Sequence, residues 1–259
     1  MTMQKTVAAA AFSLIAGAVA SFPANAQSSN PPVPARNVVL VHGAWADGSS
    51  WEKVIPILQA AGLHVTAVQN PLTSLAAADA ETRRVLALQE GPTVLVGHSY
   101  GGTIISDTGT AANVSALVYV AARAPDADED VAAVNARFPA APARSGLVTH
   151  DGLTTLSEEA FTRYFASDLP TAQAKVLFAV QQPTATSTFT ARTTAAAWHD
   201  KPTFYAVAKQ DLTISPDLER FFAQRMNATT VEVDSGHLAM ISQPEAIANL
   251  ILQAAGRTR

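Results

Sequence analysis

The chain has 259 residues, of which 48% are hydrophobic and 15% charged, and its formal net charge is −4. This length and apolar content are typical of a single globular domain with a sizeable core. Because the chain contains no cysteine, disulfide frameworks, thiolate zinc sites, iron–sulfur clusters and a cysteine nucleophile are excluded. The acidic balance and the lack of a Lys/Arg-rich run also argue against a nucleic-acid partner.

The first residues predict a secretory signal peptide at residues 1–26. Lys5 supplies positive charge, Val7–Ala20 is an apolar run, and Ala24-Asn25-Ala26 is an A-x-A cleavage site. The run is too short to cross a bilayer, so no stable membrane anchor is expected. The proline-rich linker at residues 27–36 disfavours the alternative, an N-terminal helix packed on the core. We therefore expect an exported protein, either periplasmic or secreted.

From residue 37 onward, short valine-rich runs alternate with longer Ala/Leu-rich segments. The alternation is typical of an α/β fold in which helices cover both faces of a mostly parallel sheet. Six strands are predicted, at Val38–Val41, Val65–Val68, Thr93–Val96, Ala116–Val120, Thr203–Ala208 and Thr229–Val233. Five helices are predicted between and after them, at Trp51–Ala61, Ser74–Glu90, Gly101–Thr110, Asp217–Met226 and Pro244–Ala255.

The alternation is interrupted once, by about eighty residues between the fourth and fifth predicted strands, far more than a crossover helix requires. This stretch contains two helical patterns, Ser157–Phe165 and Thr171–Gln181, and a Thr/Ser-rich end at Thr184–Thr194. We interpret an insertion at about residues 126–197 as a helical cap over the carboxyl edge of the sheet, where open α/β sheets bind ligands. The α/β domain, with this cap inserted in it, would then span residues 37–259.

The third predicted strand runs into the motif Gly97-His98-Ser99-Tyr100-Gly101, which matches G-x-S-x-G and precedes a predicted helix. A sharp strand-to-helix turn of this kind needs small residues on either side of the serine and exposes the Ser99 hydroxyl at the sheet edge. The motif alone is a weak signal, but an apolar strand before it and a helix after it are the context that it requires. We therefore predict Ser99 as a catalytic nucleophile.

A serine nucleophile needs a histidine base, which in turn is oriented by a carboxylate. His237 follows the last predicted strand and is the favoured base, while Asp211 follows the fifth strand and is the favoured acid. Asp126, after the fourth strand, is the rival acid, and Asp234 is interpreted as a local turn contact. The remaining histidines are interpreted as packing, loop or surface residues: His42, His64, His98, His150 and His199.

Acyl transfer also requires donors aimed at the developing oxyanion. The backbone N–H groups of Tyr100, at the start of a helix, and of Ala44, in the first loop, are predicted to supply them. Trp45, Tyr100 and Leu238 are predicted to contact substrate. Further aromatic candidates for the pocket or for the core of the cap are Phe161, Tyr164, Phe165, Phe178, Phe189 and Trp198.

Taken together, these motifs resemble the α/β-hydrolases, specifically the small branch of plant methylesterases, hydroxynitrile lyases and bacterial relatives. The resemblance covers residue 37 to about residue 255 and rests on four matching segments: His42-Gly43-Ala44-Trp45 with Ser50-Trp51, Gly97-His98-Ser99-Tyr100-Gly101-Gly102, Asp211 with Ile214-Ser215-Pro216, and Gly236-His237 with Met240. It implies a Ser99–Asp211–His237 triad, an oxyanion hole from Ala44 and Tyr100, and a mostly helical cap.

Two departures from the lyases favour ester hydrolysis within that branch. The lyases carry a threonine after the first-loop histidine and a lysine after the catalytic histidine, whereas this chain has Gly43 and Leu238. The expected activity is cleavage of small to medium, mainly apolar carboxylic esters, since no cationic cluster is apparent in the cap, and it needs no cofactor or metal. A ligand-binding or signalling protein with slow turnover and a perhydrolase are the alternatives. The sequence does not indicate an oligomeric state.

Overall fold

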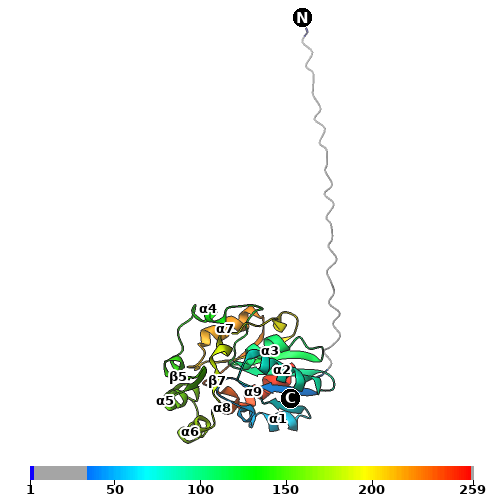
Figure 1. Cartoon of the computed structure of the whole chain (residues 1–259). Coiled ribbons are helices and arrows are strands. Elements are labelled where there is room, and N and C mark those ends of the chain that lie inside the picture. Colours follow the sequence, from blue (N-terminus) through cyan, green and yellow to red (C-terminus); the bar gives the residue numbers. More distant parts are fainter. Residues whose placement is uncertain (3–33, 258–259) are drawn as a thin grey trace. The chain divides into compact units, whose positions relative to one another are not determined.

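The computed structural model describes residues 1–2 and 34–257 (Figure 1). The predicted export signal lies outside the described residues apart from its first two positions, as does most of the predicted linker, so export stays a prediction. Within the described part of the chain, no helix is long and apolar enough to span a membrane.

A six-stranded, fully parallel sheet forms the centre of the fold, in the order β2-β1-β3-β4-β8-β9. The predicted α/β class and all six predicted strands are confirmed, with small differences at the strand ends. The strands are β1 (Asn37–Val41), β2 (His64–Val68), β3 (Thr93–His98), β4 (Val114–Val120), β8 (Thr203–Ala208) and β9 (Thr229–Val233). Strands β1 and β3 are buried along their whole length, as their continuous apolar sequences predict.

The strand order fixes where a ligand can bind. The chain passes from β1 to β2 on one side and then returns to place β3 on the other side of β1. The loops that follow β1 and β3 therefore leave in opposite directions and open a crevice at the carboxyl edge of the sheet. These two loops carry His42–Trp45 and Ser99.

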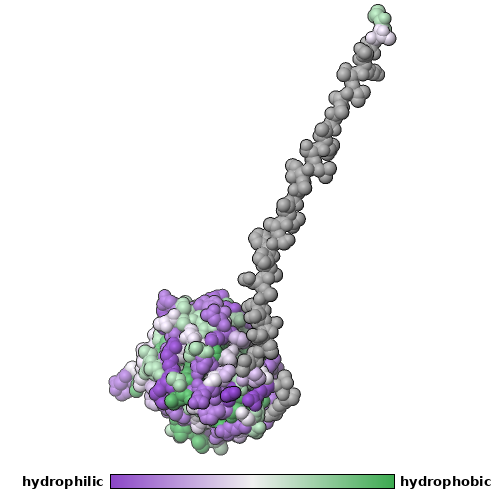
Figure 2. Space-filling model, turned by 90° about the vertical axis from the view of Figure 1, so that its right-hand side faces the viewer, coloured by the Kyte–Doolittle hydropathy of each residue, from purple (hydrophilic) through white to green (hydrophobic). Residues whose placement is uncertain are grey.

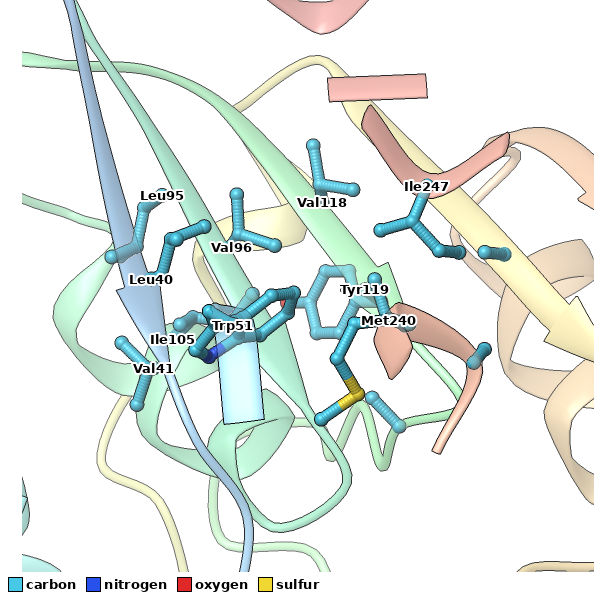
Figure 3. Packing of buried hydrophobic residues seen from close by; sticks show 14 of the residues in the cluster. Leu40, Val41, Trp51, Leu95, Val96, Ile105, Val118, Tyr119, Met240 and Ile247 are labelled. Atoms are coloured by element: carbon cyan, nitrogen blue, oxygen red, sulfur yellow. The ribbon is translucent and has the colours of Figure 1, made fainter. Parts of the chain in front are cut away.

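Helices cover both faces of the sheet. The core helices are α1 (Ile55–Ala60), α2 (Leu75–Ala87), α3 (Gly101–Thr108), α7 (Pro216–Arg225), α8 (Ala239–Ser242) and α9 (Pro244–Ala254). Ser106 of α3 hydrogen-bonds the Tyr119 hydroxyl on one face of β4. The neighbouring Val118 must point to the opposite face, where α9 packs on β4 and β8, and Figure 3 shows Val118 beside Ile247 among the buried side chains.

The helix predicted at Trp51–Ala61 is corrected to two shorter pieces. A 3-10 turn at Gly48–Trp51 is capped by Asp47, whose carboxylate accepts a hydrogen bond from the Ser49 amide at 2.7 Å. Helix α1 then starts afresh at Ile55, with Pro56 in its first turn, where the missing N–H of proline is tolerated.

The inserted cap contains helices and also a small antiparallel sheet that the sequence analysis did not predict. Its strands are β5 (Leu147–His150), β6 (Leu153–Leu156) and β7 (Thr184–Ala185), in the order β5-β6-β7. Its helical segments are α4 (Val131–Asn135), α5 (Glu158–Ala160), a π-helical turn at Phe161–Phe165, α6 (Thr171–Ala179) and 3-10 turns at Pro142–Gly146, Thr186–Phe189 and Ala197–His199. Figure 1 shows β5, β7, α5 and α6 gathered on one side of the molecule.

The β5–β6 hairpin had a recognisable signal. Asp151-Gly152 joins the two strands, and both residues have positive φ, 47° and 75°. An Asp-Gly pair with this geometry is typical of a two-residue hairpin turn, whose twist matches that of the flanking strands.

The exposed apolar surface is concentrated on the cap. Apart from Met1 and Leu88, the strongly exposed large apolar side chains of the described residues all lie there: Leu147, Val148, Leu153, Val176 and Val180. The face seen in Figure 2, which lies away from the cap, instead mixes hydrophilic and hydrophobic side chains.

Candidate active site

The turn between β3 and α3 places Ser99 in a strained conformation. Ser99 has φ of 54°, a left-handed value that is uncommon for any residue other than glycine, and it is nearly buried. The turn is so tight that a Cβ on Gly97 would lie 2.6 Å from the Gly101 carbonyl oxygen. The close backbone contact explains why this motif requires small residues. The turn is a nucleophile elbow.

The loop after β1 lies directly against this elbow. A Cβ on Gly43 would lie 2.7 Å from the Cβ of Ser99, so only glycine permits this approach. The next residue, Ala44, and the residue after the serine, Tyr100, line the same cavity as Ser99. The backbone N–H groups of Ala44 and Tyr100 donate no hydrogen bond within residues 34–257. Both amides are therefore available to a ligand atom.

Asp211 and His237 form a fully buried pair. The Asp211 Oδ2 atom lies 2.6 Å from His237 Nδ1, and the other carboxylate oxygen accepts hydrogen bonds from the amides of Thr213 and Ile214 at 2.6 and 2.9 Å. These amides fix the carboxylate, and the carboxylate in turn orients the imidazole. His237 Nε2 is buried and has no hydrogen-bond partner among the described residues.

His98 links the serine turn to the histidine loop. Its Nε2–H donates to the carbonyl oxygen of His237 at 2.9 Å, and the two imidazole rings lie 4.6 Å apart. Burial, and then the neighbouring His237, lower the pKa of His98 well below its usual range. A neutral His98 adjacent to Ser99 therefore brings the loop of His237 to the serine turn.

The cap supports both loops at the sheet edge. Asp168 accepts a hydrogen bond from the Gly236 amide at 2.7 Å, next to His237, and the Phe165 ring lies 5.1 Å from the His237 ring. Trp45 donates from its indole nitrogen to the Thr154 carbonyl oxygen at 2.9 Å. Two segments of the cap, at Thr154 and at residues 165–168, therefore contact the loops that follow β1 and β9.

A cavity of about 280 Å³ opens beside Ser99, between the sheet edge and the cap. Trp45, Tyr100 and Phe189 line it, with Ser99 and Ala44. Leu238 does not line this cavity: it lies, 2% exposed, in a smaller hollow that it shares with Trp45, Phe161 and Phe165.

The other candidate residues have partners elsewhere. The rival acid Asp126 lies on the surface, 3.1 Å from His199 Nε2, and is not beside His237. Asp234 forms an ion pair with Lys209 at 2.7 Å. His42 is buried against the Gly43 carbonyl oxygen at 2.9 Å, and burial lowers its pKa.

A comparison with protein families identifies the fold. The model of the family described as alpha/beta hydrolase matches residues 38–250, which is most of the chain. The chain belongs to the alpha/beta hydrolase family.

Solved structures with this fold include several hydrolases. Polyneuridine aldehyde esterase is similar at 19% identity and a TM-score of 0.73, covering 85% of this chain and 98% of its own. A pyrethroid hydrolase from Sphingobium faniae has 20% identity and a TM-score of 0.72, covering 86% and 98%. A methylesterase from Arabidopsis has 19% identity and a TM-score of 0.68, covering 85% and 98%. The search of curated proteins returned no match.

This hydrolase has a second carboxyl group beside Asp211 that the sequence analysis missed. Glu219 of α7 is fully buried, and its Oε2 atom accepts a hydrogen bond from the Ala208 amide at 2.9 Å. Burial, and then the charge of Asp211, raise the pKa of Glu219 well above its usual range. A protonated Glu219 can donate a hydrogen bond to Asp211.

The cavity also contains two cationic side chains that were not predicted to lie at the site. Arg144 of the cap and Arg123, just after β4, both line the cavity that holds Ser99. Neither residue stands in a basic run, so no local pattern indicates that the two lie in one cavity. Among the described residues, no group of three or more His, Asp or Glu side chains could hold a metal ion.

Proposed function

We propose that the protein is a serine hydrolase that cleaves carboxylic esters through an acyl-enzyme on Ser99. The observation that carries this proposal is the buried Asp211–His237 pair, at 2.6 Å, which His98 connects to the nucleophile elbow of Ser99. The structural neighbours named above, two esterases and a pyrethroid hydrolase, support this proposal.

In the proposed first step, Ser99 Oγ attacks the ester carbonyl carbon while His237 Nε2 accepts the hydroxyl proton. Asp211 holds the proton on Nδ1 and so keeps Nε2 free to act as the base. The negative charge that develops on the carbonyl oxygen is stabilised by the amides of Ala44 and Tyr100.

The tetrahedral intermediate then collapses, and His237 returns the proton to the departing alcohol. In the second half of the reaction, His237 takes a proton from water, whose oxygen attacks the acyl carbon, and Ser99 leaves with that proton. The proposed chemistry uses no cofactor.

The loop after β1 supports hydrolysis over cyanohydrin cleavage. The lyases that this sequence resembles carry a threonine at the position of Gly43, but any Cβ there would lie 2.7 Å from Ser99 Cβ. The lysine that follows their catalytic histidine is replaced here by Leu238, so this position offers no ammonium group to stabilise departing cyanide.

The proposal is tested with a fluorophosphonate probe and a panel of p-nitrophenyl esters of different chain length. We expect one covalent label, located on Ser99 by peptide mapping, together with turnover of at least one ester. Ser99→Ala is expected to lose both the label and the turnover. Ser242→Ala, at a half-buried serine outside the cavity, is expected to keep both. A label on another residue would exclude Ser99 as the nucleophile, whereas labelling without turnover of any ester would indicate a binding protein.

A further inference from the structure

We propose that the substrate of this site carries a free carboxylate group, which Arg123 binds while Ser99 attacks the ester. The inference deepens the proposed function and rests on it, because it names the class of ester. Its basis is the placement of two arginines, without any acidic side chain, in the cavity beside Ser99.

Arg123 is held next to the nucleophile by the backbone. Its amide donates to the carbonyl oxygen of Ser99 at 3.2 Å, so the two residues lie next to each other in the cavity wall. Its guanidinium lies 5.5 Å from the centroid of the Phe189 ring, which lines the same cavity. One small molecule can therefore contact Ser99 and the Arg123 guanidinium together.

The charge of Arg123 is not neutralised by the protein. Its side chain is half-buried and forms no ion pair or hydrogen bond with any described residue. By contrast, Arg225 is also half-buried but pairs with Glu129, with 2.6 Å between Nη1 and Oε1. An enclosed charge without a partner is costly, and it is retained where a ligand supplies the opposite charge.

The rest of the cavity adds to the positive potential. Arg144, on the rim, is exposed and close enough to Arg123 to lower the pKa of Arg123 further, after burial, to about 10. Arg123 therefore stays charged at neutral pH. No Asp or Glu of residues 34–257 lines the cavity, so nothing there compensates the two cations. Such a site attracts anions and repels cationic esters.

A carboxylate fits this arrangement better than a doubly charged phosphate group. The guanidinium presents parallel N–H donors that match the two oxygens of a carboxylate. Among the described residues that line the cavity, Arg123 is the one enclosed cation, since Arg144 lies at the solvent-exposed rim, and one enclosed positive charge is balanced by a ligand with one negative charge. The cavity volume of about 280 Å³ is at the small end for ligand sites, as expected for a short-chain monoester of a dicarboxylic acid.

The first test uses the unmodified enzyme and pairs of esters. Monomethyl esters of the straight-chain dicarboxylic acids from succinate to suberate are each compared with the methyl ester of the monocarboxylic acid of equal chain length. We expect kcat/KM at pH 7 to be about 10–100-fold higher for at least one acidic ester, as for a hydrogen-bonded ion pair. Equal rates for every pair, or faster neutral esters, would overturn the inference.

Variants identify which residue causes the preference for acidic esters. Arg123→Met is expected to remove the difference in kcat/KM between the acidic esters and their neutral partners, and Arg123→Lys is expected to retain part of that difference. Arg144→Met should reduce it less and mainly at low salt. Arg163→Met is the matched control, because Arg163 lies in the cap, outside the cavity, paired with Glu159. Loss of the preference in Arg163→Met, or its persistence in a folded Arg123→Met, would contradict the assignment.

A binding measurement tests the carboxylate site independently of the proposed ester hydrolysis. Calorimetric titration with hexanoate, and with inorganic phosphate in parallel, requires no turnover. Weaker binding of hexanoate to Arg123→Met by about tenfold would support the carboxylate site even if no ester were cleaved. Equal binding of hexanoate to both proteins, or binding of phosphate alone, would overturn it, whereas turnover of neutral esters with labelled Ser99 would still support the proposed function.

Discussion

Two pairs of carboxyl groups in this protein have the same construction but different neighbours. In the first, Asp211 is fixed by the amides of Thr213 and Ile214, and Glu219 lies beside it with a raised pKa. In the second, between α2 and α3, Asp107 accepts hydrogen bonds from Thr194, and Asp79 lies beside it. Burial, and then the charge of Asp107, raise the pKa of Asp79 to about 8.

The two pairs differ in what the carboxyl group anchored by hydrogen bonds contacts. Asp211 faces the imidazole of His237, whereas Asp107 faces the guanidinium of Arg83 at 3.8 Å. In both pairs burial and the adjacent carboxyl group raise the pKa of the second member, Glu219 or Asp79. A perturbed carboxyl therefore does not by itself mark a catalytic site. The contact with a base next to a nucleophile distinguishes the first pair.

The largest expected effect comes from replacing the anchored carboxyl group of the first pair, and the same replacement in the second pair is its control. Asp211→Asn should lower kcat on p-nitrophenyl esters by about 10³–10⁴-fold, because the amide no longer holds the imidazole in the productive tautomer. Asp107→Asn should leave kcat unchanged. Asp126→Asn tests the rival acid and should also be neutral, since Asp126 contacts His199 on the surface. A large loss in Asp126→Asn with full activity in Asp211→Asn would reverse the assignment.

A smaller effect is expected at the protonated member of the first pair. Glu219→Gln preserves an acceptor for the Ala208 amide and a donor for Asp211, so its kcat should stay within about threefold of the unmodified value. Glu219→Leu removes both groups and should lower kcat by about tenfold, as expected for the loss of a hydrogen bond to a charged group. The pH profile of kcat/KM distinguishes a positioning role of Glu219, which changes the profile, from a loss of folded protein, which does not. If Gln and Leu behaved alike, Glu219 would have no positioning role.

The sheet and its edge were predictable because their signals are local. Apolar runs identified all six strands, and the motif around Ser99 together with the loops of Asp211 and His237 followed from their positions after strands. The carboxyl ends of parallel strands meet at one edge, so residues far apart in sequence could be expected to gather there. Helix ends were less well predicted, as at Trp51, where a capped turn interrupts the helical pattern.

The cap and its contacts were much less predictable, because they depend on how an insertion folds back. Asp168 and Arg123 stand in polar or small-residue segments that look like surface loops, and only tertiary packing places them against Gly236 and in the cavity. Glu219 lies on an otherwise amphipathic helix, and nothing in that pattern indicates that it faces Asp211. The Asp151-Gly152 hairpin turn is the exception, since its signal is local.

The smallest effect, on stability alone, is expected at the protonated member of the second pair. The folded protein keeps a proton on Asp79 up to about pH 8, whereas the unfolded chain releases it near pH 4. The stability contribution of this proton is complete below pH 4 and declines as the pH rises toward 8. Asp79→Asn does not titrate, so its Tm should exceed that of the unmodified protein by an amount that grows between pH 4 and pH 8, with unchanged turnover. Glu52→Gln, at an exposed carboxyl, is the control, and a Tm difference independent of pH would show that Asp79 is ionised in the folded state.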